Sequence, residues 1–274
     1  MAAAVRTRAR RRRSSVVRGI VDAFVEHNLL TYAAAIAFQA LLSLIPLALL
    51  GLGLLGAFGM EDVWSDSIAP HIRGKVTAPV FHGLDFTGRR IVQNGDPGLI
   101  AFATVLSLWY LTAAVRAIME ALDTIHDVRD RRPWRRRAVI ALGLAAFSGI
   151  GLIGSVLLVA AGPRAGGAAG VALGIGRWIL AVLALGVVVG VLVRTAPAEH
   201  PEPRWASAGS VLVIASWLVA TVVFRLWIRY VADFETPVGS LAGLLVFTGY
   251  LFVSAAVFLV GVQLDELLRK RRRA

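Results

Sequence analysis

The stretch from residue 33 to residue 58 reads AAAIAFQALLSLIPLALLGLGLLGAF, and it contains no charged residue. An α-helix of about 20 apolar residues crosses a hydrocarbon core of about 30 Å. The stretch is longer than that, so it is predicted to be a transmembrane helix. A cleaved signal peptide is not favoured, because such peptides have an apolar region of only about 7 to 15 residues followed by a small-residue cleavage site.

Five more apolar runs follow this first one, and together they predict an all-α, polytopic membrane bundle of six helices. The expected spans lie at about residues 33–58, 98–115, 138–162, 171–193, 205–224 and 239–262. They form one expected transmembrane domain, residues 16–268, between basic tails at 1–15 and 269–274. Hydrophobic residues make up 57% of the chain, above the share of about 45–50% that is usual in soluble domains. The sequence leaves no room for a separate soluble domain.

The basic residues predict how the bundle is oriented. Of the 29 Lys and Arg residues, 20 lie before the first span, between the second and third, between the fourth and fifth, or after the sixth. Only six lie in the segments on the other side. Because positive charge collects on the cytoplasmic side, both termini are expected in the cytoplasm of a bacterium, with the chain in its inner membrane. Anionic lipid headgroups, and not nucleic acid, are the expected partners of these basic tails and loops.

Amphipathic helices are expected at the edges of the bundle. Val17, Ile20, Val21 and Phe24 recur at helical spacing, which predicts an N-terminal helix lying in the headgroup plane. Residues 60–97 mix both signs of charge with isolated apolar residues, which is typical of short amphipathic helices that cap a bundle.

Prolines mark a further turn on the cytoplasmic side. The segment 195–204 contains Pro197, Pro201 and Pro203. Each proline prevents a helix from continuing, so this segment is predicted to be a stiff hairpin between the fourth and fifth spans.

Polar residues share one face of the first span. Tyr32, Gln39, Ser43 and Pro46 are seven, four and three residues apart, a spacing that aligns them on one side of a helix. Pro46 has no N–H, so the carbonyl of Leu42 loses its usual partner. Two interpretations stay open. The polar face either makes hydrogen bonds between helices, worth about 0.6–2 kcal/mol each, or it lines a cavity that touches a headgroup.

Charged residues follow the second span at the same kind of spacing. Arg116, Glu120, Asp123 and Asp127 are four, three and four residues apart, and Arg116 and Glu120 are expected to form an ion pair. One interpretation is a solvated extension of the helix, with Arg116 reaching toward the headgroups. The other is a gating or coupling site.

Arg177 interrupts the fourth span. Without it, the remaining apolar run of residues 178–193 is about 24 Å long, short of the hydrocarbon core. Arg177 is therefore either submerged in the bilayer, where an arginine usually has a functional partner, or it reaches the outer headgroups. Arg225 and Arg229 lie among aromatic residues and are expected to form an outer interfacial belt, or to hold a lipid phosphate.

Enzymatic chemistry is not expected. The chain has no cysteine, and its five histidines lie singly, without the spacing that places two of them on one metal ion. Nucleotide-binding loops and nucleophile elbows are also missing from the sequence. No cofactor and no metal are predicted. Glycines within the spans are interpreted as close helix contacts: Gly51, Gly53, Gly56, Gly59, Gly143, Gly149, Gly151 and Gly154.

Three stretches resemble one bacterial family. They are NLLTYAAAIAFQALLSLIPLALLG at 28–51, LWYLTAAVRAIMEALDTIHDVRDRRPWRRR at 108–137 and GSLAGLLVFTGYLFVSAAVFLVGVQLDELL at 239–268. The chain is similar there to the YihY/BrkB family of inner-membrane proteins, over residues 16–268. The resemblance implies six spans and a role in moving lipids or envelope components, and it implies that the family's old ribonuclease label is an error. Gln39 departs from the family pattern, which has an aromatic residue there.

The leading hypothesis is a membrane protein that moves or accommodates a lipid or another amphipathic envelope molecule. The alternative is a scaffold that assembles envelope proteins without transporting anything, and ribonuclease activity is disfavoured. The sequence does not predict the oligomeric state. The expected cavity or headgroup-binding residues are Tyr32, Gln39, Ser43, Pro46, Arg116, Glu120, Arg177 and Arg225.

Overall fold

The structure, a computed structural model, describes residues 24, 26–73, 78–128, 130–160, 167–198, 208–230 and 237–273. All regular structure in these ranges is helical. The long helices are α2 (Leu29–Ala57), α5 (Pro97–Ile125), α6 (Trp134–Ala160), α7 (Gly167–Thr195), α8 (Ala208–Tyr230) and α9 (Pro237–Arg273). The short ones are η1 (Val63–Ile68), α3 (Ala69–Arg73) and α4 (Ala78–Asn94). The expected N-terminal tail and nearly all of the expected interfacial helix lie outside the described residues.

Six long helices confirm the predicted all-α membrane bundle. Within the described residues, α2, α5, α6, most of α7 and most of α9 are long and apolar enough to cross a bilayer. The sixth helix, α8, has 23 residues, and its apolar part runs over Leu212–Trp227.

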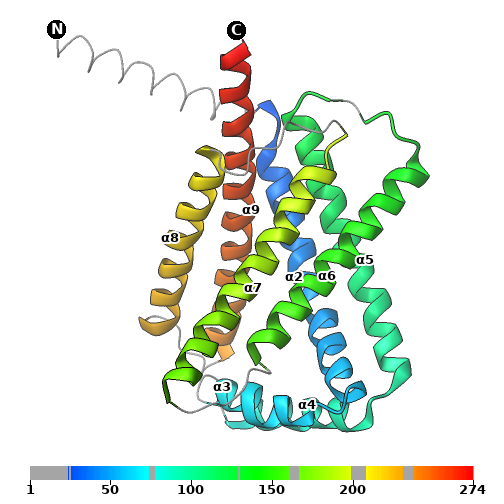
Figure 1. The fold of residues 1–274 in the computed structure, drawn as a ribbon, viewed down its shortest axis with the longest axis vertical. Helices are drawn as coiled ribbons and strands as arrows, with labels where there is room; N and C mark the ends of the chain where they lie inside the picture. Colours follow the sequence, from blue (N-terminus) through cyan, green and yellow to red (C-terminus); the bar gives the residue numbers. More distant parts are fainter. Residues whose placement is uncertain are drawn as a thin grey trace, which may run out of the picture.

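α2 lies between α9 and α5 in the bundle (Figure 1). α5 and α9 pack directly on α2, α6 packs on α5, α7 packs on α6, and α8 packs on α9. α2 begins and α5 and α9 end at one end of the bundle, which we call the tail end (Figure 1). α4 lies across the opposite end, the capped end (Figure 1).

The centre of the bundle joins α2, α5 and α9. Leu29 and Ala33 of α2, Ala121 and Ile125 of α5, and Leu259 of α9 are all fully buried in one cluster. Leu and Ala fill this space without placing a polar group in it, and each fully buried large apolar side chain makes dense dispersion contacts. These three helices are the best-packed part of the described chain.

The capped end confirms the expected short amphipathic helices. The indole of Trp64, in η1, is buried and donates a hydrogen bond from Nε1 to Asp85 Oδ1 of α4 at 3.1 Å. Gly88 lies under this ring, where a Cβ would come within 2.3 Å of it. Arg89 Nε also donates to Asp85, at 2.9 Å. Burial raises the pKa of Asp85, but these two hydrogen bonds outweigh it and hold the pKa below its usual value.

Helix ends follow local signals in the sequence. α5 begins where the Asp96 side chain accepts a hydrogen bond from the Gly98 N–H at 2.8 Å, with Pro97 at the first helical position. α2 ends at Ala57, and Gly59 follows the C-cap residue with a φ of 65°, the left-handed conformation that closes a helix C-terminus.

Two helices continue well beyond the apolar runs that predicted them. The second span was expected to end near residue 115, but α5 continues to Ile125. α9 was expected to end near residue 262, but it has 37 residues and ends at Arg273. At 1.5 Å per residue α9 is about 55 Å long, far more than a hydrocarbon core of about 30 Å. Hydropathy detects only the part of a helix that lies in lipid, so it did not predict the extension of α9. The helical spacing of Arg116, Glu120 and Asp123 had pointed to the extension of α5.

The glycine prediction was right for half of the residues. A Cβ at Gly53, Gly56, Gly149 or Gly151 would come within 3.1 Å of a neighbouring helix. The closest approach is at Gly56, where it would lie 2.2 Å from the carbonyl oxygen of Val92. The interpretation was wrong for those that face open space or cap a helix: Gly51, Gly59, Gly143 and Gly154.

Candidate functional site

The polar face of α2 is used largely for contacts within the bundle. The Tyr32 hydroxyl lies 3.4 Å from Thr124 Oγ1 of α5, and Ser43 Oγ donates to the Ala40 carbonyl of its own helix at 2.7 Å. Pro46 is buried inside α2. Gln39 differs from them, because its Oε1 is buried and has no hydrogen-bond partner among the described residues.

The expected ion pair between Arg116 and Glu120 is not formed. Glu120 pairs with Arg137 of α6 instead, with Oε1 and Nη2 3.2 Å apart. Arg116 is exposed. Spacing along one helix predicted the wrong partner, because a neighbouring helix brings a second guanidinium to the same carboxylate.

Asp123 holds the end of α7. Its side chain is buried, and Oδ1 accepts a hydrogen bond from the backbone N–H of Ala198 at 2.8 Å. Arg132, between α5 and α6, donates from Nη2 to the Pro197 carbonyl. Pro197 is fully buried. We call Asp123, Arg132, Pro197 and Ala198 the α7 clasp.

The clasp was not found in the sequence. Asp123 was interpreted as part of a solvated extension or a gating site, and the structure shows that it is not solvated. Its partner lies 75 residues away, so no local pattern reports the contact. The prolines of the expected hairpin gave a partial signal, because Pro197 ends α7 where the clasp closes; Pro201 and Pro203 lie outside the described residues.

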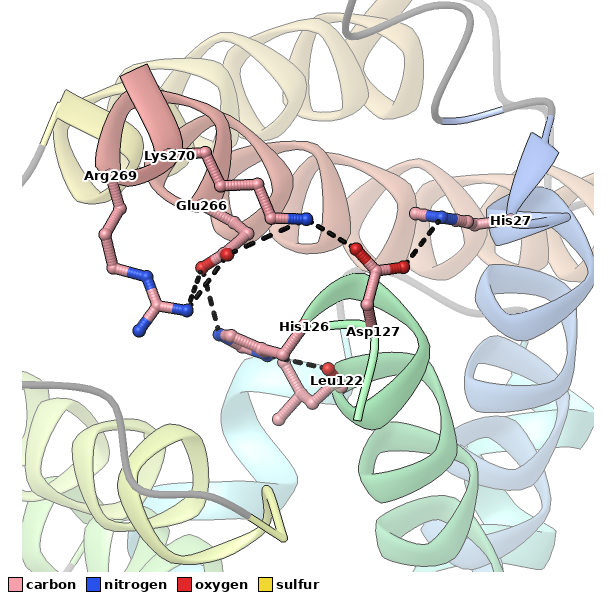
Figure 2. A network of polar contacts seen from close by, with 7 residues as sticks. All are labelled: His27, Leu122, His126, Asp127, Glu266, Arg269 and Lys270. Carbon is pink, nitrogen blue, oxygen red and sulfur yellow. Dashed lines mark hydrogen bonds and ion pairs between the residues drawn. The ribbon is translucent and has the colours of Figure 1, made fainter. Parts of the chain in front are cut away.

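A second polar cluster joins the tail ends of α5 and α9 (Figure 2). We call it the α5–α9 network, and its side chains are His27, His126, Asp127, Glu266, Arg269 and Lys270. Glu266 of α9 is buried and accepts a hydrogen bond from Arg269 Nη2 at 2.9 Å. His126 Nε2 lies 3.9 Å from Glu266, and its Nδ1 lies 2.7 Å from the Leu122 carbonyl.

Asp127 lies at the turn that ends α5. Its φ of 54° is left-handed, and the N–H of Val128 donates to the Asp123 carbonyl at 3.0 Å, as in a helix C-terminal cap. Its carboxylate lies between Lys270 and His27 (Figure 2). The hydrogen bond from Lys270 holds the pKa of Asp127 below its usual value. Asp127 therefore links the end of α5 to His27 and to Lys270 of α9. It does so from the turn after α5, whereas it was expected on the charged face of the helix itself.

The packing of α6 on α7 places Arg177 along the bundle. Gly151 of α6 faces Val188 of α7, and the two helices run in opposite directions. Arg177 is 11 residues before Val188, about 16 Å closer to the capped end. Along the bundle, Arg177 is therefore slightly closer to the capped end than Ala160, the last described residue of α6. It lies in the half of α7 nearer the capped end, ten residues after the helix begins at Gly167.

Arg177 and Arg225 are far from the other expected site residues. Arg177 is partly exposed, with its Nε buried and without a partner among the described residues. Arg225 is exposed and lies five residues before the end of α8. Tyr32 and Glu120 belong to the tail end instead, so the expected residues do not form one site.

Apolar helices arranged around α2, with their charged groups collected at the two ends, define a polytopic helical membrane protein. Among the described residues, no group of three or more His, Asp or Glu side chains is placed to hold a metal ion. The chain belongs to the BrkB family, because the family model described as Virulence factor BrkB matches residues 20–274.

Curated relatives agree with this assignment. The chain is 22% identical over 269 residues to the ribonuclease-like protein YfkH of Bacillus subtilis, covering 94% of this chain and 97% of the relative. It is 26% identical over 260 residues to a UPF0761 membrane protein of Ralstonia nicotianae, and 25% identical over 270 residues to one of Xanthomonas campestris. These alignments cover 89% and 94% of this chain but 56% and 62% of the relatives' own length. No solved structure matches the chain.

Proposed function

We propose that this protein accommodates or moves an anionic lipid, or another anionic amphipathic molecule, along the exposed faces of α7 and α8. The observation that carries the proposal is Arg177, whose buried Nε has no hydrogen-bond partner among the described residues, on a helix that packs mainly against α6.

The shape of this part of the bundle supports the proposal. Along α7, Leu180, Leu183 and Val187 are each more than half exposed, and α8 exposes Leu218 and Val222 to a similar degree. Exposed apolar faces of membrane-spanning helices pack against acyl chains when the protein is in a bilayer. The amphipathic ligand would lie with its tail on these faces.

The charge of the site supports an anionic headgroup. A guanidinium has five N–H donors and pairs well with phosphate. Arg177 offers a guanidinium in the half of α7 nearer the capped end, and the exposed Arg225 lies near the same end of α8. A phosphate would supply the partner that Arg177 Nε lacks among the described residues.

We propose the orientation that the positive-inside rule predicts, with the tail end in the cytoplasm of a bacterium and the capped end outside its inner membrane. The chain has no cysteine, so single cysteines report accessibility without background. In intact cells, a membrane-impermeant maleimide should label Gln93→Cys in α4 and leave Lys270→Cys unlabelled. Labelling of Lys270→Cys alone would contradict this orientation.

The transport proposal is tested in liposomes that contain the purified protein and a fluorescent anionic phospholipid. The wild type should move this lipid between leaflets faster than empty vesicles do, and Arg177→Ala should slow the movement by about tenfold, the effect of about 1.4 kcal/mol. Arg177→Lys keeps the charge and should retain part of the rate.

Arg194→Ala is the matched control, because Arg194 is an exposed arginine at the other end of the same helix. This control should behave like the wild type. Movement no faster than in empty vesicles, or equal loss in Arg177→Ala and Arg194→Ala, would overturn the proposal.

A scaffold that binds other membrane proteins is the second candidate. It is favoured by glycines that face open space on the outer helices, since small residues let a partner helix approach closely. They are Gly143 and Gly154 of α6 and Gly174, Gly176 and Gly186 of α7. Cross-linking in cells should then recover one partner protein in fixed proportion, and Gly176→Leu should abolish its recovery while Arg177→Ala does not.

The proposal involves no catalysis. Hydrolysis of RNA requires bound metal ions or an acid–base pair, and the name of the Bacillus subtilis relative is the single pointer toward it. Protein purified from a nuclease-deficient host should leave labelled RNA intact. Degradation that is lost on substitution of a residue in this chain would contradict the proposal.

A further inference from the structure

We propose that the α7 clasp is a releasable anchor, which holds the tail end of α7 closed and controls the opening of the α7 face toward the cytoplasm. This inference rests on the proposed function, because it concerns the regulation of the same lipid-binding face. Its structural part, the anchoring of α7, is tested without any lipid substrate.

The burial of α7 is strongly uneven along its length. Between Leu173 and Leu180 no described residue is buried. Among the residues from 173 onward whose burial is described, the buried ones all lie further on: Ala181, Val188, Leu192, Ala196 and Pro197. Over this described part, α7 is therefore more firmly packed toward its tail end.

Two hydrogen bonds hold the tail end. Asp123 Oδ1 accepts from the Ala198 N–H at 2.8 Å, and Arg132 Nη2 donates to the Pro197 carbonyl. The N–H and C=O of the peptide group between Pro197 and Ala198 are thus bound by a carboxylate and a guanidinium, respectively. Charge-assisted hydrogen bonds are stronger than neutral ones, so these two contacts decide where α7 ends relative to α5.

The two charged side chains of the clasp use only part of their hydrogen-bonding capacity among the described residues. Asp123 Oδ2 and Arg132 Nη1 are both buried and have no hydrogen-bond partner among the described residues. Buried polar groups without partners are costly, and both would gain hydrogen bonds to water if the clasp opened. These gained contacts would offset part of the cost of breaking the two clasp hydrogen bonds.

The residues that hold α7 stay in place when it is released. Asp130 accepts a hydrogen bond from the Arg132 backbone N–H at 2.9 Å and pairs with its side chain at 3.8 Å. Arg137 of α6 pairs with the same carboxylate at 3.6 Å. Arg132 is fixed to the connection between α5 and α6, so the clasp opens at Pro197 and Ala198 and the end of α7 is the part that moves.

Spin labels measure the predicted movement in the full-length protein. One pair, Arg194→Cys with Val139→Cys, spans exposed positions at the tail ends of α7 and α6. A second, which we call the capped-end pair, is Leu180→Cys with Val156→Cys; it spans exposed positions nearer the capped end. In Asp123→Ala the distance distribution of the tail-end pair should broaden and lengthen, while that of the capped-end pair stays unchanged. Exchange of the Ala198 amide hydrogen should become about tenfold faster or more, since its hydrogen bond is lost.

Asp123→Asn is the matched control. It removes the charge but keeps an oxygen that accepts from Ala198, so exchange of that amide should stay within about threefold of the wild type. Arg132→Ala breaks the clasp from its other side and should reproduce the Asp123→Ala result. It also serves as the deciding variant if Asp123→Ala does not fold.

Lipid movement tests the regulatory part. With the clasp open, Asp123→Ala in liposomes should move the fluorescent anionic phospholipid at least about threefold faster than the wild type, and Asp123→Asn should not. Unchanged tail-end distances and unchanged exchange in folded Asp123→Ala and Arg132→Ala would overturn the anchor. Changed distances with an unchanged lipid rate would overturn the claim that the clasp controls the α7 face. Absence of lipid movement in every protein, including the wild type, would refute the proposed function. In that case the spin-label distances still test whether the clasp anchors α7.

Discussion

The three central helices and the two outer ones differ in how deeply they bury apolar side chains. α2, α5 and α9 contact one another and bury Leu29, Met119 and Leu259 completely. α7 packs mainly on α6 and α8 on α9, and among the described residues neither of these outer helices buries a large apolar side chain completely. Helices in lipid gain little from hiding apolar surface, so the outer pair can remain open to ligands at little cost in stability.

A substitution in the core of the central helices should have the largest effect on the free energy of unfolding. Met119→Ala removes a fully buried side chain and should lower the free energy of unfolding by about 2–5 kcal/mol. Leu180→Ala, in the exposed part of α7, should change it by less than about 0.5 kcal/mol. Reversible unfolding in mixed micelles measures both. Equal losses would mean that α7 contributes to the core.

A close helix contact should give the next largest effect. A Cβ at Gly56 would lie 2.2 Å from the Val92 carbonyl oxygen, whereas Gly51 of the same helix faces open space. Gly56→Ala should therefore destabilise the protein by about 1–3 kcal/mol, because the backbone of α4 must shift. Gly51→Ala should be neutral or stabilising by up to about 1 kcal/mol. The same unfolding measurement compares them, and a harmless Gly56→Ala would show that α4 does not rest on α2.

The spans were predictable from the sequence because hydropathy is a local property. The partners of the charged groups were not, because the fold brings them from distant segments. Tyr32 meets Thr124 across 92 residues, and Ala198 meets Asp123 across 75. The depth of Arg177 in the bilayer stays a prediction, since its spacing along the chain fits either a submerged or an interfacial arginine.

The α5–α9 network should contribute less than the core. Asp127 and Lys270 are both more than half exposed, so their pair is partly screened by solvent. A double-mutant cycle with Asp127→Asn and Lys270→Met should give a coupling of about 0.2–1 kcal/mol. Asn is chosen because it tolerates the left-handed φ at this position. A coupling near zero would show that Lys270 does not hold the end of α9.

Acid should weaken the same pair. The folded-state pKa of Asp127 is lowered by the hydrogen bond from Lys270, so the carboxylate contributes stability above its unfolded pKa of about 3.9. That small contribution should be lost as the pH falls through the folded pKa. Unfolding of the wild type and Asp127→Asn between about pH 6 and pH 3 should converge as the pH falls, and parallel curves would contradict the shift.

Native mass spectrometry of the purified protein with equal amounts of anionic and zwitterionic phospholipid tests the central claim most directly. The wild type and Arg194→Ala should retain the anionic lipid preferentially, and Arg177→Ala should lose that preference. Equal retention of the two lipids by the wild type, or an unchanged preference in Arg177→Ala, would contradict the claim that the open face of α7 receives an anionic headgroup.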